Sequence, residues 1–165
     1  MRPSLFELAG GEPAFQRLAA AHHARCLADP ELNHPFSKPD GHPQHVERLG
    51  LYWAEVLGGP PRFSAQCSDQ SAVLRMHAGN GDMSDLGERF ERCFDAAMDD
   101  AGLPADPEFR AAMRAYMHCA VGEFIAHPDG PESVAPDAAM PRWDMTSWQL
   151  TQYGLPEEQA GEEPS

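Results

Sequence analysis

Apolar side chains recur every three to four positions in four segments of this chain, the spacing that places them on one face of an α-helix. The pattern predicts helices over residues 13–28, 43–57, 84–101 and 107–127. Nowhere do several β-branched residues alternate with polar ones, as a half-buried strand requires. The chain is therefore predicted to be all-α.

Residues that start and end helices bound these segments. An Asp-Pro pair at 29–30 ends the first helix, and a Gly-Gly-Pro-Pro run at 58–61 ends the second. Ser84 can cap the start of the third helix, and Asp106, followed by proline, that of the fourth. The two longer connections, residues 30–42 and 58–83, read as irregular. The second is long for a structureless link, so we expect it to have a function of its own.

The composition changes after residue 127. Residues 128–165 are rich in proline and carry eight acidic residues against one arginine. We predict a helical domain over residues 1–127, followed by an acidic extension. Trp143 and Trp148 predict that the middle of the extension docks on the domain, whereas its end reads as disordered.

The net charge and the cysteines exclude some classes of function for this chain. The 165 residues carry a net charge of −14, which disfavours nucleic acid or an anionic membrane as the main partner. No apolar run reaches the roughly 20 residues of a membrane span, and the start lacks a signal-peptide layout, so we expect a cytoplasmic protein. The four cysteines form no C-x-x-C pair and read as reduced and structural, with Cys93 and Cys119 expected on the apolar faces of their helices.

Histidines are the main candidates for chemistry. The chain has eight of them, and it lacks a G-x-S-x-G motif, a phosphate-binding glycine loop and an H-E-x-x-H motif. His45 lies one turn before Leu49 on the apolar face of its helix, where a hydrogen-bonded boundary residue is the ordinary alternative. His77 precedes a glycine-containing turn, where a surface histidine is the alternative. A metal site built from His22, His23 and Cys26 is disfavoured, because adjacent helical residues point about 100° apart.

Several short motifs together resemble a known family. Gly10-Gly11 precedes the first long helix, Ala28-Asp29-Pro30-x-Leu32 ends it, and Phe36 follows. Gly58-Gly59-Pro60 and the run Leu74-Arg75-Met76-His77 come next, before the two final amphipathic helices. This order and spacing over residues 4–127 resembles the group II truncated haemoglobins, in their actinobacterial form. The resemblance implies a globin-like two-over-two helical sandwich around haem.

The resemblance also implies roles for individual residues. His77 matches the proximal iron ligand, and without a C-x-x-C-H motif the cofactor is expected to be non-covalent haem b. His45 matches the distal position that faces an iron-bound gas, with Leu49 as its apolar wall. The remaining expected haem contacts are Phe36, which packs on the porphyrin, Arg48 and Arg75, which face the propionates, and Phe90.

Two positions depart from the family pattern. Group II members usually have a tyrosine late in the first long helix and a tryptophan on the third, and His23 and Phe90 stand there in this chain. Imidazole thus replaces a phenol, and an indole donor is lost. His22, next to His23, is expected to be a hydrogen-bonded core histidine.

The resemblance implies binding of oxygen, carbon monoxide, nitric oxide or a similar small ligand at a His-ligated iron, with oxygen transport as one use. Redox activity is a further expectation: nitric oxide detoxification or a peroxidase-like oxidoreductase reaction, in which His45 or His23 moves the proton and an unidentified reductant supplies electrons. The alternative from another class is a helical sensor or interaction module in which haem is regulatory or absent.

Overall fold

The computed structural model describes residues 2–33 and 43–145. This part contains helices and no strand. The helices are α1 (Leu5–Ala9), α2 (Glu12–Ala28), α4 (His45–Val56), α5 (Arg62–Gln66), α6 (Gln70–His77), α7 (Ser84–Asp100) and α8 (Pro107–Phe124), with a 3₁₀ turn at Pro131–Ser133. The predicted all-α class is confirmed.

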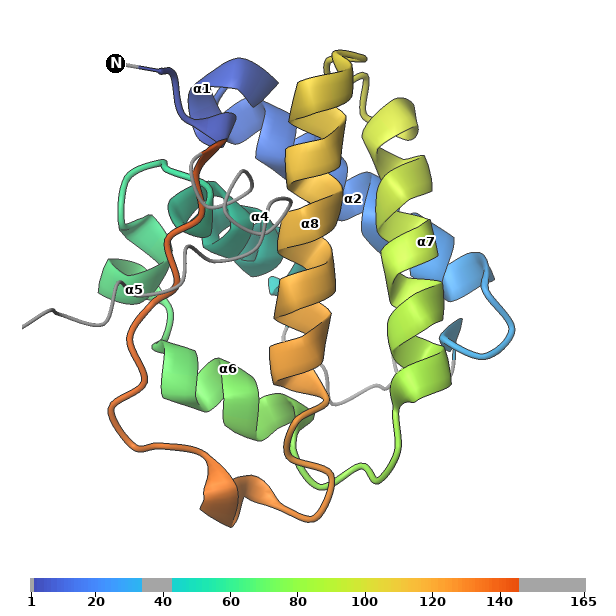
Figure 1. Ribbon diagram of the computed structural model, residues 1–165, viewed down its shortest axis with the longest axis vertical. Coiled ribbons are helices and arrows are strands. Elements are labelled where there is room, and N and C mark those ends of the chain that lie inside the picture. The colour runs from blue at the N-terminus through green and yellow to red at the C-terminus, as the bar shows by residue number, and fades with distance from the viewer. Residues whose placement is uncertain (1, 34–42, 146–165) are drawn as a thin grey trace, which may run out of the picture.

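The long helices form two layers. α2 packs against both α4 and α7, and α7 packs against α8. In Figure 1, α7 and α8 stand side by side at the front, and α2 and α4 lie behind them. This arrangement is the predicted two-over-two sandwich.

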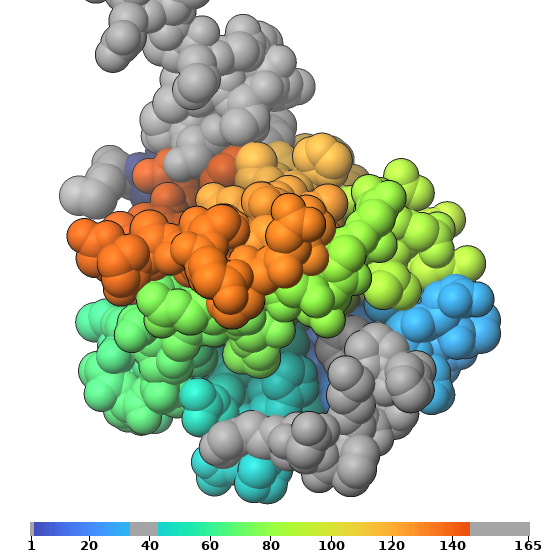
Figure 2. All heavy atoms as spheres, turned by 90° about the horizontal axis from the view of Figure 1, so that it is seen from below, coloured from blue at the N-terminus to red at the C-terminus, as the bar shows by residue number. Residues whose placement is uncertain are grey.

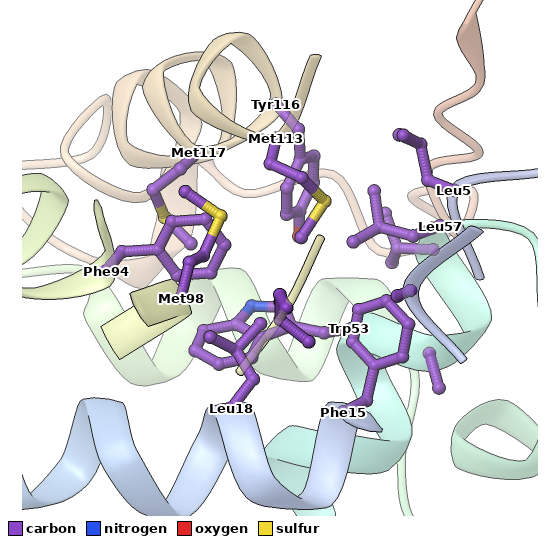
Figure 3. Packing of buried hydrophobic residues seen from close by; sticks show 14 of the residues in the cluster. Leu5, Phe15, Leu18, Trp53, Leu57, Phe94, Met98, Met113, Tyr116 and Met117 are labelled. Carbon is purple, nitrogen blue, oxygen red and sulfur yellow. The ribbon is translucent and has the colours of Figure 1, made fainter. Parts of the chain in front are cut away.

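The core fills the space between these layers (Figure 3). Its largest side chains come from α1, α2, α4, α7 and α8 and are almost completely shielded from solvent. They are Leu5, Phe15, Leu18, Trp53, Phe94, Met98, Phe109, Met113 and Met117. Burial of each such side chain stabilises the fold by about 1.5–3 kcal/mol relative to its exposure. The core therefore joins all the long helices into one unit.

Side-chain caps mark the starts of α1, α6 and α8. Asp106 accepts a hydrogen bond from the Phe109 N–H at 2.8 Å and caps α8, as predicted. α7 differs from the prediction. Met83 is its N-cap residue and makes no side-chain cap, while Ser84 is the first helical residue. The Ser84 N–H and hydroxyl donate to Asp82 instead, at 2.9 and 2.5 Å, so the local acceptor lies two residues earlier than expected.

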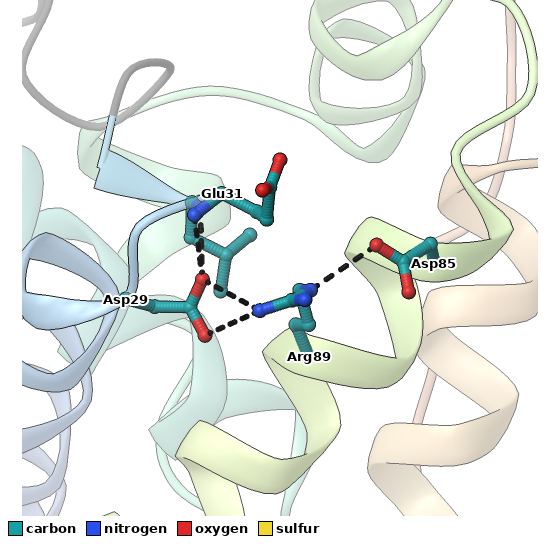
Figure 4. A network of polar contacts seen from close by, with 5 residues as sticks. Asp29, Glu31, Asp85 and Arg89 are labelled. Carbon is teal, nitrogen blue, oxygen red and sulfur yellow. Dashed lines mark hydrogen bonds and ion pairs between the residues drawn. The ribbon is translucent and has the colours of Figure 1, made fainter.

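Asp29 ties the end of α2 to α7 (Figure 4). One of its oxygens accepts from the backbone N–H groups of Glu31 at 2.9 Å and Leu32 at 3.1 Å. Arg89 of α7 donates to both Asp29 oxygens at 3.3 Å and to Asp85 at 3.1 Å. The Asp-Pro signal at 29–30 therefore marks an interhelical tie as well as a helix end.

The segment 58–83, predicted to be irregular, contains two short helices. α5 has five residues and α6 has eight, too few for an apolar period to repeat clearly. Asp69 caps α6 by accepting from the Ala72 N–H at 2.9 Å. Within this segment α6 ends at His77, so α6 is the part of the segment that carries the candidate ligand.

Residues 127–145 form a C-terminal strap along the outside of the domain. It runs from the end of α8 past α6 toward α1 (Figure 1), and Figure 2 shows it lying against α6. Ser71 of α6 donates to the Ala135 carbonyl at 2.6 Å and accepts from the Ala138 N–H at 2.9 Å. The backbone N–H of Trp143 donates to the Val56 carbonyl of α4 at 2.8 Å. Trp148 lies outside the described residues.

The cysteines do not share one environment. Cys26 is buried and Cys93 is half-buried, but Cys119 is exposed, because it lies on the outer side of α8 rather than on the predicted apolar face. All four are free thiols. No helix within residues 2–33 and 43–145 is long and apolar enough to cross a lipid bilayer.

Two helical glycines give a test of how closely α7 and α8 approach. A Cβ at Gly87 of α7 would lie 2.7 Å from Cγ1 of Val121 in α8, whereas a Cβ at Gly122 would meet nothing within 4 Å. We expect Gly87→Ala to lower the free energy of unfolding by about 1–2 kcal/mol through overpacking. Gly122→Ala is the control and is expected to raise it by about 0.5–1 kcal/mol through helix propensity. Urea unfolding measures both, and stabilisation by Gly87→Ala would contradict the close approach.

Candidate functional site

His77 presents a neutral imidazole with one nitrogen already engaged. Its Nδ1–H donates to the Val73 carbonyl one turn earlier in α6, at 2.8 Å. This bond places the proton on Nδ1 and leaves the lone pair on Nε2. Burial lowers the pKa of His77, against the opposing effect of the Val73 bond. The uncharged ring with an oriented Nε2 is the form that binds a metal.

The His77 ring and the backbone that follows it are both held by residues at the end of α8. It stacks on Phe124 of α8, with ring centroids 4.5 Å apart and planes 13° from parallel. In the turn that follows, Gly79 and Gly81 adopt φ angles of 77° and 67°, which favour glycine. Their N–H groups donate to the carbonyls of His127 and Pro128 at 2.8 and 3.0 Å. The end of α6 is thus fixed to the end of α8.

His23 and His45 lie next to each other although they come from different helices. His23 is near the end of α2 and His45 is the first residue of α4, and their ring centroids are 5.7 Å apart at 60°. Both side chains are half-buried. The structure therefore brings together the two histidines that the sequence singled out as a pair.

His22 belongs to the core, as expected. It is fully buried, its Nε2 donates to the Phe90 carbonyl at 3.3 Å, and its ring packs edge-on against Trp53 and Phe90. Burial is the main reason that its pKa falls from 6.5 to about 4, and the nearby His23 and His45 lower it further. Across the described residues no three His, Cys, Asp or Glu side chains are grouped to hold a metal ion, which argues against the His22, His23 and Cys26 site.

Apolar side chains that the core leaves partly exposed lie on the helices that surround these histidines. They are Val46 and Leu49 of α4, Phe90 of α7, Phe124 of α8 and Ile125. A large, flat, apolar cofactor would cover such surfaces and remove them from water. The oriented imidazole and these half-covered residues fit an iron porphyrin.

Comparison with known proteins agrees with this geometry. The sequence model of the bacterial-like globins matches residues 4–122, most of the described chain. The chain belongs to the bacterial-like globin family. Members of this family hold a haem iron, so the family implies that cofactor here. A search of curated proteins finds no similar sequence.

Solved structures similar to this globin include bacterial haemoglobins. That of Chloroflexus aurantiacus is 26% identical, with a TM-score of 0.64, over 75% of this chain and 98% of the other. That of Thermobifida fusca is 27% identical, with a TM-score of 0.61, over 74% and 97%. The group II truncated haemoglobin of Bacillus anthracis, at 18% identity and a TM-score of 0.64 over 81% and 99%, shares the fold. The predicted resemblance to the truncated haemoglobins is confirmed.

The other residues predicted to contact haem differ in their exposure to solvent. Arg48 is half-buried and its Nη2 lies 3.5 Å from the Cys67 carbonyl, a distance at which a hydrogen bond is weak. Arg75, in the last turn of α6, is exposed. Phe36 lies outside the described residues. The stacking of Phe124 on His77 was not predicted, although the apolar stripe of the last helix includes Phe124.

A separate open groove of about 540 Å³ lies between α7 and α8 of the globin. It contains none of the candidate-site histidines, and its one histidine is the exposed His118 of α8. Its polar side chains include a hydrogen bond between His118 and Glu91 at 2.8 Å and an ion pair between Arg114 and Asp95 at 2.6 Å. Its apolar members, Phe94 and Met117, are 1% exposed and belong to the core. The groove has no chemical link to the histidine site.

The depressed pKa of His22 predicts a pH dependence of stability. Between pH 6.5 and 4 the unfolded chain binds a proton at His22 that the folded globin does not, so the free energy of unfolding falls as the pH falls through this window. The free energy of unfolding is not reduced by His22 above pH 6.5, and it is lower by about 3 kcal/mol at pH 4. We expect a His22→Leu variant to lack this part of the pH dependence. Denaturant unfolding of both proteins at pH 7, 5.5 and 4.5 checks it, and parallel curves would contradict it.

Proposed function

We propose that this globin binds a small diatomic ligand, such as oxygen, at a haem iron coordinated by His77. The observation that carries the proposal is the Nδ1–H bond from His77 to the Val73 carbonyl at 2.8 Å, which orients Nε2 as the metal-binding nitrogen. When bound, the haem iron supplies reversible coordination of the diatomic ligand. Family membership and the haemoglobin neighbours support the same function.

The cofactor is proposed to be haem b, held without covalent bonds. Leu49 and Phe90 offer half-buried apolar surface for the porphyrin, and Phe36 is expected to join them. Arg48 and Arg75 would pair with the propionates, because guanidinium groups bind carboxylates with paired hydrogen bonds. For Arg48 this pairing would replace its long contact with the Cys67 carbonyl.

His45 and His23 are proposed to act on the ligand side. Their rings are neighbours, so one imidazole N–H can donate to the diatomic ligand while the second ring adjusts the orientation of the first. This pair would take over the task of the tyrosine that family members usually have at position 23.

The same pair favours a redox activity as a second candidate. Two adjacent imidazoles can take up and return a proton, which a peroxidase-like reduction of peroxide requires. His45 and His23 would be the groups that hold this proton. The reductant would be a separate partner, and a role as a sensor module is the competing function.

His77 is tested by removal and chemical rescue. We expect His77→Gly to lose its haem or show an altered ferrous absorption spectrum, because no other side chain replaces Nε2, and we expect added imidazole to restore the spectrum. His118→Ala, an exposed histidine on α8, is the control and should keep the wild-type spectrum without imidazole. A wild-type ferrous spectrum for His77→Gly without imidazole would show that another residue ligates the iron. Failure of the wild-type chain to bind haem at all would favour the sensor module.

The ligand side is tested by two leucine substitutions. A hydrogen bond to a partly charged ligand is worth about 1–3 kcal/mol, so removal of the true donor should raise the oxygen dissociation rate about 5- to 150-fold. If His45 is the donor, His45→Leu shows this increase and shifts the carbon monoxide stretching frequency, whereas His23→Leu changes both little. Stopped-flow and infrared spectroscopy measure these quantities. If neither variant differs from wild type by more than about twofold, the proposed role of the pair is wrong.

A further inference from the structure

Two neighbouring aromatic rings, one in α8 and one in the C-terminal strap, each carry a buried polar atom without a hydrogen-bond partner. One is the hydroxyl of Tyr116 in α8, and the other is Nε1 of Trp143 in the strap. Their rings are neighbours, with centroids 6.1 Å apart and planes inclined at 58°. Tyr116 as a whole is 3% exposed. Buried polar groups without a partner are rare in folded proteins, because each has lost its bonds to water and gained none.

Several other buried polar side chains of the domain have hydrogen-bond partners. The Tyr52 hydroxyl donates to Gln70 at 2.8 Å. Glu55 accepts from the N–H and hydroxyl of Ser64 at 2.9 and 3.0 Å. The strap backbone at Trp143 is bonded to the Val56 carbonyl. The two unpartnered atoms are therefore a specific feature of the contact between the strap and α8.

The chemistry of the two groups defines what they can bind. An indole N–H is only a donor, and a tyrosine hydroxyl that keeps its proton is also a donor. Burial raises the pKa of Tyr116 well above 10, and the nearby Tyr52 and Glu123 raise it further, so the hydroxyl stays protonated. None of these neighbours is a cation. An anion would be disfavoured by burial and by Glu123, so a neutral and small acceptor fits best.

We propose that one buried water molecule accepts hydrogen bonds from Oη of Tyr116 and Nε1 of Trp143 and thereby bonds the strap to α8. Such internal waters typically make two to four bonds to polar groups that otherwise have none. Because Trp143 is also bonded to α4 through its backbone, this water links the strap, α4 and α8 at one point. The strap is then held by a specific polar contact in addition to its apolar residues.

The direction in which Tyr116→Phe changes the folding equilibrium constant tests this site. If water occupies it, Tyr116→Phe removes a satisfied hydroxyl and should lower the folding equilibrium constant about fivefold. Tyr52→Phe is the matched control, because it removes a buried hydroxyl with a known partner and should also destabilise the protein. In a Trp143→Phe background the effect of Tyr116→Phe should shrink, since the two donors share one acceptor. An unchanged or raised constant for Tyr116→Phe would overturn the proposal.

A direct measurement keeps the proposal testable if Trp143→Phe disturbs the strap. A high-resolution crystal structure of the full chain should show one ordered water within about 3.2 Å of both Oη of Tyr116 and Nε1 of Trp143. A water bonded to only one of them, a protein acceptor in its place, or no density would each overturn the proposal. Both measurements use the haem-loaded protein, and neither depends on which ligand the iron binds.

Discussion

The burial of α2 between α4 and α7 is the contact on which the candidate site depends. One face of α2 carries Phe15, Leu18 and His22 into the core, where His22 is held by the Phe90 carbonyl. Successive residues of a helix point about 100° apart, so burial of His22 turns His23 to the margin of the core. There His23 meets His45 at the start of α4. The pairing of the two candidate ligand-side histidines is thus a consequence of how α2 packs.

His77 is held by a different kind of constraint. α6 is short and has little core of its own, with Gln70, Ser71 and Val73 as its buried residues. Its position comes from its neighbours: Phe124 stacks on His77, the glycine turn is bonded to the end of α8, and Ser71 is bonded to the strap. Because several elements hold this small helix, His77 can keep a fixed orientation. The strap therefore contributes to the geometry of the site without carrying a candidate ligand.

The two histidine environments differ in their electrostatics. Burial lowers the pKa of both His22 and His77, so both rings are neutral near pH 7. For His22 the result is structural, because its bonded ring fills the core among aromatic side chains. For His77 the result is chemical, because a neutral imidazole is the form that ligates a metal. A lowered pKa thus accompanies core packing at His22 and supports iron binding at His77.

The sequence by itself determined the helical class, the four long helices and the candidate histidines. Apolar periodicity over 12 to 18 residues and local signals such as Asp106-Pro107 are properties of short stretches of chain, so they can be read without the fold. The short motifs from Gly10-Gly11 to His77 pointed to the globin family because their order reflects one arrangement of helices. Tertiary structure alone decided the rest. The short helices α5 and α6, the exposure of Cys119, the Phe124 stack and the path of the strap depend on contacts between residues far apart in sequence, and no local pattern encodes such contacts.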